Sequence, residues 1–115
     1  MTATKIEYSH TFQDQLYSRF AYLTRHIGKQ AAQHLLTGFL DVFEERITTH
    51  PNSSPLCMEA ADIGLMAYHD YLDPKLQLRI IYRASDTGDA VYALLFLNTR
   101  QSIREALIQY CLRKT

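Results

Sequence analysis

The stretch LQLRIIYRASDTGDAVYALLFLNTR, residues 76–100, predicts two β-strands joined by a polar turn. Large apolar side chains recur at every second residue from 76 to 82, which is the period of a strand with one buried face. The run AVYALLFL, residues 90–97, is too short for a typical helix and predicts a strand buried on both faces. Residues 85–89 (SDTGD) are typical of a turn, in which Gly88 can take a positive φ.

Length and composition indicate one folded domain, residues 1–115. Hydrophobic residues make up 47% of the chain and charged residues 21%, so the chain can bury a core and does not resemble a disordered protein. The net charge is zero, but residues 1–74 hold five Lys and Arg against nine Asp and Glu, whereas residues 75–115 hold seven against three. Either the C-terminal third meets an acidic partner, or the difference is ordinary scatter of solvated charge.

The sequence has no feature of a membrane or secreted protein. No apolar run approaches the length of a membrane span, and MTATKIEYSH has no signal-peptide core, so we expect a cytoplasmic protein without a membrane partner. Cys57 and Cys111 are then expected to be reduced, structural thiols. The histidines lack metal-ligand spacing and no glycine-rich phosphate loop is present, so we expect no metal and no cofactor.

The chain before residue 51 predicts a short strand and two amphipathic helices. Residues 6–10 alternate as in a strand. Thr11 and Asp14 match a capping box, so we expect the first helix to begin at Thr11, and its apolar stripe continues to Gly28, which suits a C-terminal cap. A second helix is expected to begin near Lys29 or Gln30 and to end at His50, before Pro51, so the two helices should form an antiparallel hairpin.

The remaining segments predict further sheet and one last helix. Residues 56–72 have the least clear pattern. They predict either one strand over 64–71 or two strands, and a turn follows at Asp73 and Pro74. Ser102 is expected to cap a short C-terminal helix. The predicted fold class is α+β in two layers, with the N-terminal strand and the long helical hairpin packed on a small, mostly antiparallel sheet.

Two motifs, LRIIYR (residues 78–83) and LLFLNTRQSIREAL (residues 94–107), resemble motifs of the RelE/ParE superfamily of toxins from bacterial type II toxin–antitoxin systems. The first is similar to the basic-aliphatic-aliphatic-Tyr pattern of the family's central strand. The second is similar to its last strand and the arginine-bearing segment that opens the last helix. The element order is similar over nearly the whole chain, whereas the motifs cover only residues 76–107. The resemblance implies a growth-inhibiting toxin held inactive by a cognate antitoxin protein.

The resemblance leaves two activities and one inactive alternative open. ParE-like members are not enzymes and poison DNA gyrase, whereas RelE-like members cut mRNA on the ribosome without a metal. The ParE-like alternative is preferred because the chain is neutral rather than strongly basic, and because its helical hairpin is long. The third possibility is a non-toxic, degenerate toxin-fold interaction domain.

The resemblance also suggests site residues. If the protein is a nuclease, Arg79 and Arg100 match the family's phosphate-facing arginines, and His69 lies where members place a basic residue. No His or Tyr stands beside Arg100 to act as the acid or base, which counts against a nuclease. In the binding alternative, Arg79, Arg83, Arg100 and Arg104 contact the target or the antitoxin.

Each of these residues also has a purely structural interpretation. Arg79 could pair with a carboxylate across the sheet, and Arg100 could be a strand-end charge in solvent. His69 could be a half-exposed strand residue.

Overall fold

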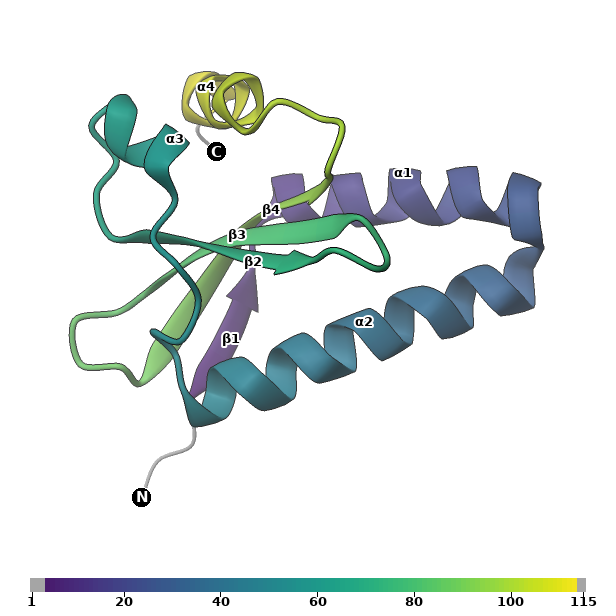
Figure 1. Cartoon of the computed structure of the whole chain (residues 1–115), viewed down its shortest axis with the longest axis horizontal. Helices are drawn as coiled ribbons and strands as arrows, with labels where there is room; N and C mark the ends of the chain where they lie inside the picture. Colours follow the sequence, from purple (N-terminus) through teal and green to yellow (C-terminus); the bar gives the residue numbers. More distant parts are fainter. Residues whose placement is uncertain (1–3, 114–115) are drawn as a thin grey trace.

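The computed structural model describes residues 4–113 as an α+β fold built around one four-stranded sheet (Figure 1). The predicted domain, residues 1–115, includes residues 1–3 and 114–115, which lie outside the described part. The elements are, in chain order, β1 (Lys5–Tyr8), α1 (His10–Ile27), α2 (Lys29–Thr49), α3 (Met58–Asp62), β2 (Tyr68–Asp73), β3 (Leu78–Ala84), β4 (Ala90–Asn98) and α4 (Ile103–Arg113). None of the described helices is long and apolar enough to cross a membrane.

The sheet has the strand order β1-β4-β3-β2, so the first and last strands of the sequence are neighbours. β1 runs parallel to β4, whereas β2, β3 and β4 form an antiparallel meander. The predicted hairpin is confirmed, and its turn is closed by the Ser85 amide, which donates to the Ala90 carbonyl at 2.8 Å. β3 begins at Leu78 rather than at residue 76, because Gln77 takes a left-handed φ of 58° that interrupts the extended backbone.

The predicted burial of β4 on both faces is confirmed. Phe96 packs in the core beneath α1 and α2, whereas Leu95 and Leu97 belong to the second core cluster, which α3 and α4 cover. The pairing of β3 with β4 shifts by one residue after Ile81, which places Leu94 in the second cluster beside Leu95. The sheet therefore supports a core on each face.

The helical hairpin forms the larger core and confirms the predicted packing of the hairpin on one face of the sheet. Gly28, at φ 89°, is the single residue between α1 and α2. Phe43 of α2 lies edge-on to Tyr82 of β3, with ring centroids 5.7 Å apart, and Phe39 packs in the same way on Phe96. These contacts hold α2 across the sheet (Figure 1).

The predicted start of the first helix is wrong. Ser9, not Thr11, is the N-cap, because its Oγ accepts a hydrogen bond from the Phe12 amide at 2.9 Å. The same hydroxyl donates to the Leu94 carbonyl of β4 at 2.6 Å, so this cap also ties α1 to the sheet. His10 consequently belongs to α1 and not to the first strand.

The predicted strand over residues 64–71 is also misplaced. β2 begins at Tyr68, because Gly64 (φ 87°) and Ala67 (φ 65°) adopt left-handed conformations. The segment before them contains the short helix α3, whose Ala60 is buried against the second face of the sheet. Residues 56–72 therefore hold one helix and one strand, where one or two strands were predicted.

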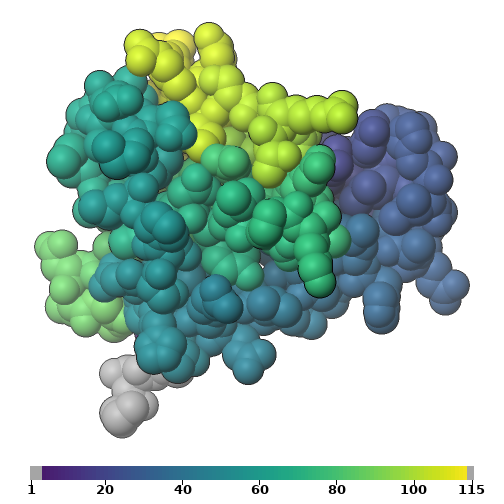
Figure 2. All heavy atoms as spheres, in the orientation of Figure 1, coloured from purple at the N-terminus to yellow at the C-terminus, as the bar shows by residue number. Residues whose placement is uncertain are grey.

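Helix α4 covers the same face as α3. Ser102 Oγ accepts from the Glu105 amide at 3.1 Å, as its capping pattern predicted. Ile103 and Leu107 are buried in the second core cluster with Cys57 and Ala60. Figure 2 shows α4, in yellow-green, lying against the teal α3 segment at the surface.

Candidate functional site

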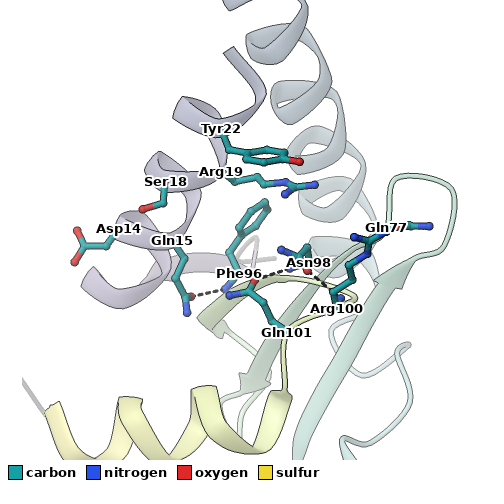
Figure 3. Close-up of a pocket in the computed structure, with 10 residues that line it drawn as sticks. All are labelled: Asp14, Gln15, Ser18, Arg19, Tyr22, Gln77, Phe96, Asn98, Arg100 and Gln101. Carbon is teal, nitrogen blue, oxygen red and sulfur yellow. Dashed lines mark hydrogen bonds between the residues drawn. The ribbon is translucent and has the colours of Figure 1, made fainter. Parts of the chain in front are cut away.

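A groove of about 750 Å³ lies between α1 and the connection from β4 to α4 (Figure 3). One wall comes from α1, and the other comes from the end of β4, the residues after it and the β2–β3 turn. The lining residues are Asp14, Gln15, Ser18, Arg19, Tyr22, Gln77, Phe96, Asn98, Arg100 and Gln101.

Three carboxamides of the groove are held by backbone N–H groups. Gln15 Oε1 accepts from the Phe96 amide at 2.8 Å, which joins α1 to β4. Gln101 Oε1 accepts from the Asn98 amide, and Asn98 Oδ1 accepts from the Arg100 amide, both at 2.9 Å. Because a backbone N–H can only donate, these bonds fix the orientation of each side chain, with its oxygen toward the backbone and its –NH₂ group pointing away from that bond. The three –NH₂ groups have no hydrogen-bond partner within residues 4–113.

Two guanidinium groups add positive charge to these donors. The Arg19 guanidinium lies 4.6 Å from the centre of the Tyr22 ring, and its buried Nε has no partner within the described chain. Arg100 is exposed, and its backbone is fixed by Asn98. Asp14, the only acidic residue of the lining, forms an exposed ion pair of 3.4 Å with Arg113 of α4. Gln15, Asn98, Gln101, Arg19 and Arg100 therefore form a cluster of hydrogen-bond donors, although the hydroxyls of Ser18 and Tyr22 and the carboxamide of Gln77 also line the groove.

Arg79 lies elsewhere and is paired. Its Nη1 is 2.9 Å from Asp70 Oδ2, so the predicted structural alternative of a carboxylate across the sheet is observed. Arg79 alternates with Leu78 and Ile80 and shares its face with Ile81, on the side covered by α3 and α4. Burial raises the pKa of Asp70 more than the Arg79 charge lowers it.

His69 lies on the opposite face of the sheet from Arg79. Its ring stacks on Tyr82, which is buried beneath the helical hairpin, and its Nδ1 is 2.7 Å from the Ser54 carbonyl oxygen. It is only 7% exposed, so the interpretation as a half-exposed strand residue is wrong. The structure does not bring His69, Arg79 and Arg100 into one site.

The other predicted arginines lie at two further places. The Arg83 guanidinium lies 4.5 Å from the centre of the Tyr92 ring, beside a smaller groove of about 280 Å³ that Tyr110 also lines. Arg104 is exposed on α4. Among the four predicted arginines, only Arg100 lines the larger groove.

Sequence reasoning missed most of the larger groove. Gln15 and Arg19 lie in no motif, and Asn98 lies in the motif at residues 94–107 but was not selected as a site residue. The bond from the Phe96 amide to Gln15 joins residues 81 positions apart. No local pattern could have indicated that these side chains meet. The one usable signal was the polar segment after the apolar strand, from which Arg100 was selected.

The described residues offer no metal site, and their buried thiol is not activated. Within residues 4–113, no three His, Cys, Asp or Glu side chains are placed to hold a metal ion. Cys57 and Cys111 are both free, as predicted, and burial raises the pKa of the Cys57 thiol. A buried thiol with a raised pKa is a poor nucleophile.

Comparison with known proteins connects this fold to toxin–antitoxin systems. No family model and no curated protein matches the sequence. Among solved structures, a chain of the chromosomal ParDE toxin–antitoxin (TA) system from P. aeruginosa superimposes with a TM-score of 0.66, covering 85% of this chain and 98% of that one at 8% identity. The chain therefore shares the fold of that ParDE-system chain. This confirms the fold that the motifs at residues 78–83 and 94–107 implied. In this fold, the first motif is the central strand β3 and the second spans β4 to α4.

Proposed function

We propose that this protein is the toxin of a type II toxin–antitoxin system that acts in the cytoplasm by binding DNA gyrase and is neutralised by a cognate antitoxin. Similarity to a chain of a ParDE system supports the toxin assignment. The observation that favours gyrase binding over mRNA cleavage is the separation of His69 and Arg79 on opposite faces of the sheet.

Cleavage of RNA through its 2′-hydroxyl needs a base, an acid and a cation around one phosphate. His69 is buried beneath the helical hairpin with its Nδ1 at the Ser54 carbonyl, and Arg79 is held by Asp70. The residues directly beside Arg100 supply amide and hydroxyl groups rather than an acid or base. These positions support a toxin that acts through a binding surface.

The helical hairpin offers a surface suited to the antitoxin. A groove of about 350 Å³ between α1 and α2 is mostly apolar, and Tyr17 at its edge is 74% exposed. Its apolar lining residues are Leu16, Tyr17, Phe20, Leu36 and Leu40. An amphipathic helix binds such a groove by burying apolar side chains at every third or fourth position. This supports a helical segment of the antitoxin as its occupant.

Controlled expression in bacteria, with separate measurements of protein synthesis and of the DNA-damage response, tests the function. We expect growth arrest with induced DNA damage while translation is still intact, together with gyrase–DNA cleavage complexes. Purified protein should then inhibit purified gyrase. Early translation arrest with cut transcripts would instead establish the nuclease alternative. Harmless expression of folded protein would establish the inactive interaction domain.

A further inference from the structure

The larger groove has a chemical preference that gyrase binding does not explain. Three of its four side-chain amide oxygens are bound to backbone N–H groups, so Gln15, Asn98 and Gln101 present donors. Arg19 and Arg100 present donors as well, because a guanidinium has no acceptor. A group with several acceptor oxygens and a negative charge complements these five side chains.

We propose that this groove binds a carboxylate side chain from an acidic segment of the antitoxin. A carboxylate offers two acceptor oxygens and pairs with the guanidinium fork of an arginine through two parallel hydrogen bonds. The identity of the partner rests on the proposed function, whereas the preference for a carboxylate rests on the groove alone. The site is separate from the apolar groove between α1 and α2, so the antitoxin contacts two surfaces.

All of these donors except the exposed guanidinium of Arg100 are held in place before any ligand binds. Asn98 is fixed by its backbone and by its side chain. Its backbone N–H donates to Gln101 Oε1, and its side-chain Oδ1 accepts from the backbone N–H of Arg100. The Arg19 guanidinium rests over the Tyr22 ring. Binding therefore orders few additional side chains, and a rigid set of donors loses little conformational entropy.

A protein carboxylate fits this groove better than a nucleic-acid backbone. Nucleic-acid binding gains its affinity from many phosphate contacts and from the release of counterions, whereas this groove holds two cations in a chain of zero net charge. The exposed ring of Tyr22 also gives the groove an apolar side, on which the methylene groups of a glutamate can pack.

The test is an NMR titration of the ¹⁵N-labelled full-length protein, with no antitoxin present. The probe is the blocked tripeptide glutamate-leucine-glutamate, and its control is the same tripeptide with glutamines. We expect saturable shifts at the side-chain –NH₂ resonances of Gln15, Asn98 and Gln101 with the acidic peptide only. Loss of a charge-assisted contact in Arg100→Gln should weaken binding about tenfold or more. The matched variant Arg25→Gln, which removes an exposed arginine of α1 outside the groove, should bind as wild type does.

Three results would overturn the carboxylate site. They are equal shifts with the glutamine peptide, an equal loss of affinity in Arg25→Gln, and an absence of shifts with either peptide. Stronger binding of a twelve-nucleotide single strand than of the acidic peptide would assign the groove to phosphate instead. Because these measurements need neither toxicity nor gyrase, they succeed or fail independently of the proposed function.

Discussion

Arg79 and Asp70 form an ion pair across β2 and β3, with 2.9 Å between Nη1 and Oδ2, and both side chains are largely buried. Asp70 Oδ1 and Arg79 Nε are also buried, and neither has a hydrogen-bond partner within residues 4–113. Arg79, which the family resemblance placed against a phosphate, is therefore already bound to Asp70. The ion pair also makes this arginine important for the stability of the sheet.

Replacing Arg79 should affect stability more than the toxic activity. Arg79→Ala leaves the Asp70 carboxylate buried without its partner, so we expect a loss of about 1–3 kcal/mol in the free energy of unfolding, measured by chemical denaturation. Growth inhibition should persist at temperatures where the variant is folded. The control is the double variant Arg79→Met with Asp70→Leu, which replaces the pair by apolar side chains and should recover stability. A stable double variant without any toxicity would show that Arg79 acts directly.

The free energy of unfolding should depend on pH through the titration of Asp70. Its pKa in the folded protein is raised above the ordinary value of 3.8, so the folded state binds this proton more tightly than the unfolded state does. The resulting stabilisation is fully present below pH 3.8 and is lost as the pH rises through the raised pKa.

Comparison with Asp70→Asn isolates this effect. The free energy of unfolding of the wild type minus that of the variant should fall as the pH increases from about 3 to about 7. In Arg79→Ala the fall should extend to higher pH, because the neighbouring charge that lowers the pKa of Asp70 is gone. A difference that stays constant or rises over this range would contradict the direction of the shift.

The Ser9 hydroxyl should contribute more to stability than an ordinary helix cap. It accepts from the Phe12 amide and donates to the Leu94 carbonyl, so Ser9→Ala removes two hydrogen bonds at a half-buried site. We expect a loss of about 1–2 kcal/mol, measured as the free energy of unfolding. Ser102→Ala, at the exposed cap of α4, is the matched control and should cost less. Equal losses would show that the bond to β4 contributes nothing.

The apolar groove of the hairpin should govern neutralisation. Tyr17→Glu places a charge at its edge, where the side chain is exposed, so folding and toxicity should be retained. Co-expression with the antitoxin should then no longer rescue growth, because a carboxylate opposes burial of an apolar helix face. Val42→Glu changes an exposed apolar residue of α2 outside the groove and should still be neutralised. Full rescue of Tyr17→Glu would exclude this groove as the antitoxin site.

Patterns between neighbouring residues were sufficient to predict the long helices, the β3–β4 hairpin and the fold class. An apolar stripe at helical spacing, a glycine between two helices and a polar turn between two apolar strands each express a preference over a few residues. The errors at Thr11 and at residues 64–71 also have a physical cause. The cap at Ser9 is reinforced by a carbonyl 85 residues away, and β2 begins late because Ala67 takes a left-handed φ.

The groove that forms the candidate carboxylate site depends on tertiary structure alone. The amide group of Gln15 becomes a fixed donor only because its oxygen meets the Phe96 amide, 81 residues further along the chain. The roles of Arg79 and Arg100 likewise depend on their neighbours in space. Arg79 is paired with Asp70, whereas Arg100 lines the groove. The sequence determines which residues carry charges and amides. The tertiary contacts determine which of these groups are paired within the fold and which remain available to bind a partner.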